Sequence, residues 1–75
     1  MKADTELDVV GQLCPMPIVK LAKHIKTMKS GEVVEVRADD IGAKEDIPAW
    51  CNRTGNKYLG MEEDGKIMKF YVQKM

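Results

Sequence analysis

Residues 5–28 read TELDVVGQLCPMPIVKLAKHIKTM, and the spacing of their apolar positions changes part-way along. In the first part, residues 5–10, apolar and polar side chains alternate. Leu7 and Val9 lie on one face and Asp8 on the other, which is typical of a half-buried β-strand. The stretch is therefore predicted to begin with a strand.

After Gly11 and Cys14 the spacing becomes helical. Ser30-Gly31 should stop the helix, and Gly31 suits a left-handed C-terminal cap. The apolar residues between these points follow the i, i+3, i+4, i+7 spacing of one helix face; they are Ile18, Leu21, Ala22, Ile25 and Met28. The change of period predicts a strand–loop–helix unit with Cys14 at the start of the helix.

The rest of the chain follows the same two periods. Asp64-Gly65 is a strong hairpin signal between the last two strands. Pro48 must lie in the first turn of the second helix or kink it. A strand, a helix and two further strands are predicted at residues 32–38, 43–54, 57–62 and 66–73.

The predicted order is β-α-β-α-β-β, within a single domain of residues 1–75. The first two strands should be parallel with a right-handed crossover, and the last two should form an antiparallel hairpin. This predicts an α/β (α+β) two-layer sandwich with a mixed four-stranded sheet and both helices on one face. The buried set should be Val34, Val36, Met68, Phe70 and Val72 against Ile18, Leu21, Ile25 and Trp50, with Glu35, Arg37, Lys69 and Gln73 on the opposite face.

The composition excludes several classes of function. Twelve basic residues balance twelve acidic ones, which argues against a tight nucleic-acid binder. Residues 32–46 are acidic and lie between two basic segments, so we expect directional docking to proteins. No signal peptide, lipidation motif or membrane-spanning run is present. We therefore expect a cytoplasmic protein whose two cysteines form no structural disulfide.

The setting of Cys14 favours a reactive thiol. If Pro15 takes the first helical position, Cys14 is the N-cap, and the N–H of Met16 is the natural partner for its sulfur. Alternatively, the helix starts only at Pro17, because Met16 also precedes a proline. Both versions leave Cys14 at the positive end of the helix dipole, where thiol pKa values fall from about 8.5 to roughly 3.5–7.5.

The surroundings of Cys14 favour a carrier over an oxidoreductase. Pro17 occupies the place of a resolving thiol, and Cys51 shares an apolar stripe with Ile47, as a core residue would. His24 is ten residues away, is expected to be solvated, and supports no Cys-His dyad. We expect no metal and no cofactor.

The predicted docking surface beside Cys14 is Met16, Val19, Lys20 and Lys23. Asp39 and Asp40 are expected to be turn and cap residues.

The chain resembles the TusA/SirA-like sulfur carrier family over nearly its whole length. The opening signature is a Leu-Asp strand end that leads through Gly to Cys-Pro-x-Pro. The matching residues are Leu7-Asp8, Gly11, Cys14-Pro15-Met16-Pro17, Gly31-Glu32, Val34, Val36, Asp39, Asp40, Asp46-Ile47-Pro48 and Trp50-Cys51.

The resemblance implies that Cys14 carries sulfur as a persulfide, with Pro15 and Pro17 positioning it. A cysteine desulfurase or a rhodanese-like protein would load the sulfur, and an acceptor protein would receive it. Family tasks include tRNA thiolation, cofactor synthesis and sulfur oxidation. Met16 stands where the carriers of tRNA thiolation typically have an acid. A monomer suits such a shuttle.

Two other functions remain open on sequence grounds. In the first, Cys14 senses redox state in a regulatory module, and a reversible sulfenic acid or disulfide changes partner binding. In the second, the sheet binds RNA, as a similar layout does in a domain of a translation initiation factor. The neutral charge and the lack of clustered aromatic residues weigh against RNA binding.

Overall fold

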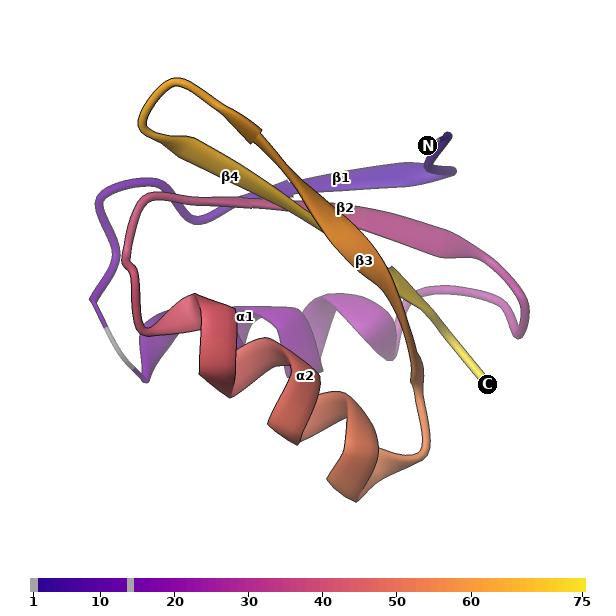
Figure 1. Cartoon of the computed structure of the whole chain (residues 1–75). Helices are drawn as coiled ribbons and strands as arrows, with labels where there is room; N and C mark the ends of the chain where they lie inside the picture. Colours follow the sequence, from indigo (N-terminus) through magenta and orange to yellow (C-terminus); the bar gives the residue numbers. More distant parts are fainter. Residues whose placement is uncertain (1, 14) are drawn as a thin grey trace.

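The computed structural model describes residues 2–13 and 15–75, and its elements follow the predicted order (Figure 1). The second helix matches its predicted bounds, whereas the first helix is shorter than predicted at both ends. The elements are β1 (Thr5–Asp8), α1 (Met16–Ile25), β2 (Val33–Ala38), α2 (Ala43–Thr54), β3 (Lys57–Asp64) and β4 (Ile67–Gln73).

The four strands form one mixed sheet in the order β1-β2-β4-β3. β1 and β2 are parallel, with Thr5 opposite Val34, while β4 is antiparallel to both β2 and β3. Both helices cover the same face of this sheet (Figure 1). The predicted two-layer α+β sandwich is therefore confirmed.

The core lies between the sheet and the two helices. The predicted inward residues of β2 and β4 are buried, and Ile18 packs against them while partly exposed. From α1 the core takes Leu21 and Ile25, and from α2 it takes Ile47, Trp50 and Cys51. The completely buried side chains include Val9, Leu21, Val34, Val36, Ile47, Phe70 and Val72. The helical and strand periods of the sequence therefore identified most of the core.

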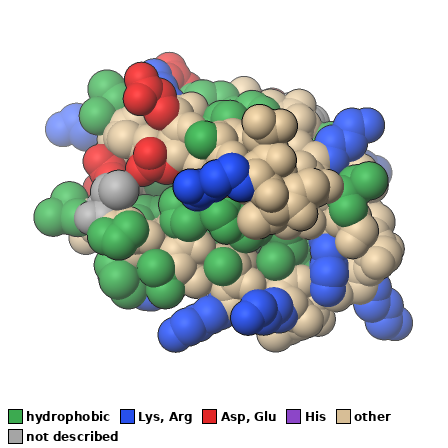
Figure 2. All heavy atoms as spheres, turned by 90° about the horizontal axis from the view of Figure 1, so that it is seen from below, with side chains coloured by type: hydrophobic (Ala, Val, Ile, Leu, Met, Phe, Trp, Pro, Cys, Tyr) green, Lys and Arg blue, Asp and Glu red, His purple; other side chains and the backbone are tan. Residues whose placement is uncertain are grey.

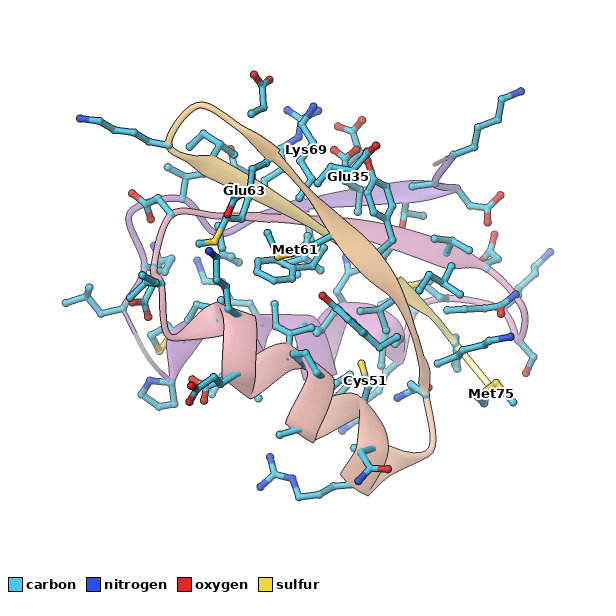
Figure 3. The ribbon with its side chains drawn as sticks, viewed as in Figure 1. Glu35, Cys51, Met61, Glu63, Lys69 and Met75 are labelled. Carbon is cyan, nitrogen blue, oxygen red and sulfur yellow. The ribbon has the colours of Figure 1, made fainter. Side chains whose placement is uncertain are left out.

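The uncovered face of the sheet carries charged groups held in a network (Figure 3). The Arg37 Nε donates a hydrogen bond of 2.7 Å to Glu35 Oε2, and the Tyr71 hydroxyl lies 3.0 Å from Glu35 Oε1 and 2.8 Å from Glu62 Oε1. The Arg37 hydrogen bond holds the pKa of Glu35 below its usual value, against the opposing effect of desolvation. Glu35 lies on the predicted face, yet these contacts leave it only 9% exposed.

The end of α1 differs from the prediction. The helix ends at Ile25, because the amides of Thr27 and Met28 bond to carbonyls three residues back, to His24 and Ile25. Gly31 does have a positive φ of 89°, but it is not the helix cap. Its N–H donates instead to the Lys74 carbonyl at 2.7 Å. Gly31 therefore turns the chain into β2.

One further local prediction needs correction, and one open alternative is narrowed. The hairpin turn is Gly65-Lys66, one residue later than predicted, because Asp64 still pairs with Ile67. Of the two alternatives left open for Pro48, the first turn is excluded, because the residue lies inside α2, which continues past it to Thr54. No helix of the described residues combines the length and the apolar character needed to cross a membrane.

Candidate functional site

Two loops meet where the parallel strands end. The first loop, residues 9–13, leaves β1, and the second loop, residues 39–42, leaves β2. Both lie at the same end of the molecule, next to the starts of α1 and α2 (Figure 1). The carboxyl ends of parallel strands are the usual place for functional groups in α/β sheets.

The first loop continues the pairing of β1 with β2. Val9 is completely buried, and its N–H donates to the Arg37 carbonyl at 2.8 Å. The Val10 N–H donates to Asp8 Oδ1 at 2.9 Å, and the Gln12 N–H donates to the Val9 carbonyl at 3.0 Å. These hydrogen bonds and the burial of Val9 fix the position of the backbone where the loop leaves the sheet.

Gly11 links the first loop to the second. Its N–H donates to Asp39 Oδ1 at 2.9 Å, and its φ of +84° is in the left-handed region. That conformation favours glycine. Asp39 had been predicted only as a turn or cap residue, so this link across 28 positions of sequence was missed.

The start of α1 differs from the main prediction by one residue. Pro15 is the N-cap, Met16 is the first helical residue and Pro17 the second. The Pro15 carbonyl accepts the bond from Val19, and the Met16 N–H donates to the Leu13 carbonyl at 2.8 Å. The Met16 N–H was predicted to be the natural partner for the Cys14 sulfur, but in the structure it already donates to a backbone carbonyl. Cys14 itself lies outside the described residues.

Apolar side chains are exposed around this helix start. Met16 and Val19 are exposed as predicted, by 40% and 38%, but Leu13 and Ile41 are each exposed by 74%. Figure 2 shows hydrophobic side chains gathered at this end of the molecule. We define the apolar end patch as Val10, Leu13, Met16, Val19 and Ile41.

Three members of the apolar end patch were missed by sequence reasoning. Leu13 belongs neither to the strand alternation nor to the helical stripe. Its position directly before Cys14 was the signal that could have identified it as part of the exposed surface. Ile41 lies between Asp40 and Gly42 in a turn, outside the periodic segments from which the core was predicted. Val10 was placed in the first strand, which ends two residues earlier at Asp8.

The predicted basic side chains lie beside the patch on α1. Lys20 and Lys23 are each four residues after Met16 and Val19, respectively, so each pair shares one side of the helix. Lys23 is exposed and Lys20 is half-buried. Between the start of α1 and α2, a groove of about 250 Å³ is lined by Pro15, Ile18, Asp46, Ala49 and Arg53.

Cys51 has surroundings of the opposite kind. It points from α2 toward the sheet (Figure 3) and is 1% exposed. Burial raises the pKa of its thiol to about 11. The prediction that Cys51 belongs to the core is confirmed.

The prediction for His24 was wrong. The side chain is half-buried, and its Nε2 lies 3.0 Å from Thr5 Oγ1. It therefore joins α1 to β1 instead of pointing into solvent. Within residues 2–13 and 15–75, no three His, Cys, Asp or Glu side chains are grouped to hold a metal ion.

Comparison with known proteins places this architecture in a family. The model of the family described as sulfurtransferase TusA matches residues 5–74. The chain belongs to the TusA family. The resemblance to the TusA/SirA-like family, predicted from residues along nearly the whole chain, is thereby confirmed.

Individual members of the TusA family align over almost the whole chain. The protein YrkF of Bacillus subtilis is 47% identical over 74 residues, which are 99% of this chain but only 40% of YrkF. The sulfur carrier protein TusA of Allochromatium vinosum is 38% identical over 71 residues, covering 95% of this chain and 93% of that protein.

A solved structure supports the fold. The crystal structure of a SirA-like protein from Desulfitobacterium hafniense superposes with a TM-score of 0.80, over 92% of this chain and 95% of that one. The sequence identity is 21%, so this similarity bears on the fold alone.

Proposed function

We propose that the protein is a sulfur carrier that holds sulfur as a persulfide on Cys14. The observation that carries the proposal is the exposure of the residues on both sides of this cysteine. Leu13 is 74% exposed, and Pro15 and Met16 are exposed at the start of α1. Membership of the TusA family supports the same role.

The transfer step needs no oxidant or reductant. The Cys14 thiolate attacks the outer sulfur of a donor persulfide, forming a new S–S bond on Cys14. The S–S bond of the donor breaks, and the donor cysteine leaves as a thiolate. The transferred sulfur keeps its proton. The same step, with Cys14 as the donor, then delivers sulfur to the acceptor.

The residues after Cys14 favour the thiolate and position it. Cys14 directly precedes Pro15, the N-cap of α1, so it adjoins the positive end of the helix dipole. Pro15 and Pro17 restrict the backbone on this side. Pro17 is also buried, which anchors the helix start to the rest of the protein.

The apolar end patch provides the contact surface for the partners. Met16, Val19, Lys20 and Lys23 form its predicted part, to which Leu13 and Ile41 add the most exposed side chains. The donor would be a cysteine desulfurase or a rhodanese-like protein. The acceptor would belong to tRNA thiolation, cofactor synthesis or sulfur oxidation. We also propose that the chain is a single domain and acts in the cytoplasm. A monomer suits this role, because both partners must reach Cys14 in turn.

The test is the intact mass after incubation with a cysteine desulfurase, cysteine and pyridoxal phosphate. We expect a gain of about 32 Da, one sulfur atom, that a reductant removes. Cys14→Ser should abolish the gain and Cys51→Ser should retain it. No gain with a desulfurase or any other persulfide donor would reject the carrier role. A reversible sulfenic acid on Cys14 that alters partner binding would then favour the redox-sensing alternative.

A further inference from the structure

We propose that Asp39 is a positioning residue for sulfur transfer, because its carboxylate holds Gly11 and so directs the chain toward Cys14. The inference rests on the proposed carrier function and adds a residue from the second loop to it. Asp39 directly follows β2, and Gly11 precedes Cys14 by three residues.

The Asp39 contact takes over where the backbone pairing of the sheet ends. Among the residues that the structure describes, the last backbone bond between the two chain segments joins the Val9 N–H to the Arg37 carbonyl at 2.8 Å. Two residues further along each segment, the Gly11 N–H donates to Asp39 Oδ1 at 2.9 Å. A side-chain oxygen thus extends the pairing of β1 and β2 into the two loops.

The other hydrogen bonds described for residues 10–13 are local. Val10 bonds to Asp8, Gln12 bonds to Val9, and Leu13 accepts from Met16. These bonds join the loop only to the neighbouring ends of β1 and α1, and none of them reaches the second loop. The Asp39 contact therefore sets where the first loop lies against the second, on the approach to Cys14.

A positioning role and a charge role for Asp39 predict different results. Asp39→Asn keeps an oxygen that accepts the Gly11 N–H but removes the charge. Asp39→Ala removes both. If the hydrogen bond matters, Asn should behave as the wild type and Ala should fail. If the charge matters, the two variants should fail alike.

Asp4 offers a matched control at the opposite end of the same strands. Its Oδ2 accepts the Val33 N–H at 2.8 Å, so it too joins a carboxylate to an exposed backbone amide across β1 and β2. Asp4→Ala removes the same kind of bond far from the two loops (Figure 1). It therefore measures the general cost of losing one such contact.

The experiment measures the loading rate of the full chain against the concentration of a cysteine desulfurase, with intact mass as the readout. We expect Asp39→Ala to lower the maximal rate about fivefold to tenfold, as loss of one ordinary hydrogen bond implies. The half-saturating concentration should stay the same. Asp39→Asn and Asp4→Ala should stay within about twofold of wild type, because each leaves the Gly11 contact in place. Amide exchange at Gly11 should accelerate in Asp39→Ala alone.

The alternative outcomes are distinct. If the wild type takes up no sulfur, the carrier function fails and this inference fails with it. If the wild type loads and Asp39→Ala loads equally fast, the positioning role is overturned while the carrier function stands. An equal loss in Asp39→Asn would replace positioning with a charge effect. An equal loss in Asp4→Ala would show a general effect on stability.

Discussion

The two cysteine-bearing segments, residues 10–19 and 47–54, place their apolar side chains in opposite surroundings. Each contains proline and each contributes to a helix. In the first segment Leu13 and Met16 are exposed to solvent, whereas in the second Ile47 is fully buried and Cys51 is 1% exposed. Burial raises the pKa of the Cys51 thiol to about 11.

The difference shows that residue type alone does not separate a reactive cysteine from a core cysteine. The second segment follows the helical spacing, so its apolar residues coincide with the face that α2 turns to the sheet. In the first segment the loop and the helix start interrupt that spacing. Its exposed apolar residues, which are Val10, Leu13, Met16 and Val19, lie outside the core and are available for contact with another protein.

The largest contrast should appear in thiol alkylation. At pH 8, with a thiol pKa of about 11, only about one Cys51 in a thousand is a thiolate. We expect iodoacetamide to modify one cysteine of the native protein, Cys14, at least about a hundredfold faster than the buried Cys51. Peptide mass spectrometry assigns the site, and denaturant should expose the second. Rapid labelling of native Cys14→Ser would contradict the comparison.

Truncation of apolar side chains should affect stability very differently in the two segments. Ile47→Ala should lower the free energy of unfolding by about 2–5 kcal/mol, because it leaves a cavity in the core. Leu13→Ala should change it by less than about 0.5 kcal/mol. Urea denaturation measures both. Similar losses in the two variants would show that Leu13 is part of the core in solution.

The exposed Leu13 should matter for binding, although it contributes little to stability. Leu13→Ser should weaken the complex with the sulfur donor at least about tenfold, because burying a leucine is worth about 1.5–3 kcal/mol. Met75→Ser is the control, since Met75 is 68% exposed at the other end of the molecule (Figure 3). Titration calorimetry measures the dissociation constant of the complex for each variant.

The basic part of the docking surface should give a smaller effect on the same complex. Lys20→Ala with Lys23→Ala should slow association a few-fold, and added salt should remove the difference. For the apolar part, an equal loss of affinity in Met75→Ser and Leu13→Ser would show that the apolar end patch is not the binding site.

The smallest effect should be a pH dependence that involves neither cysteine. The Arg37 hydrogen bond lowers the pKa of Glu35 in the folded state below its ordinary value of 4.5. The resulting stabilisation is present above that value and is lost as the pH falls through the folded pKa. Arg37→Met should therefore reduce the fall in melting temperature between pH 6 and pH 3. An unchanged fall would show that this ion pair does not contribute.

Much of the fold was predictable because its signals are local. The second helix was located to the residue, and the alternation in β2 and β4 identified their buried faces. The start of α1 was off by one residue, since Pro15 and Pro17 allow more than one start. His24 was misplaced because its partner, Thr5, is 19 residues away.

The sequence by itself determined the element order, the core and the cysteine motif at a helix start. These depend on periodicity and on the backbone restrictions of proline, which act over a few residues. Only the tertiary structure decided that Asp39 holds Gly11, and that Leu13 and Ile41 lie exposed at the same end. The parallel pairing of β1 and β2 brings those two loops together, and no local pattern specifies which side chain of one loop reaches which backbone amide of the other.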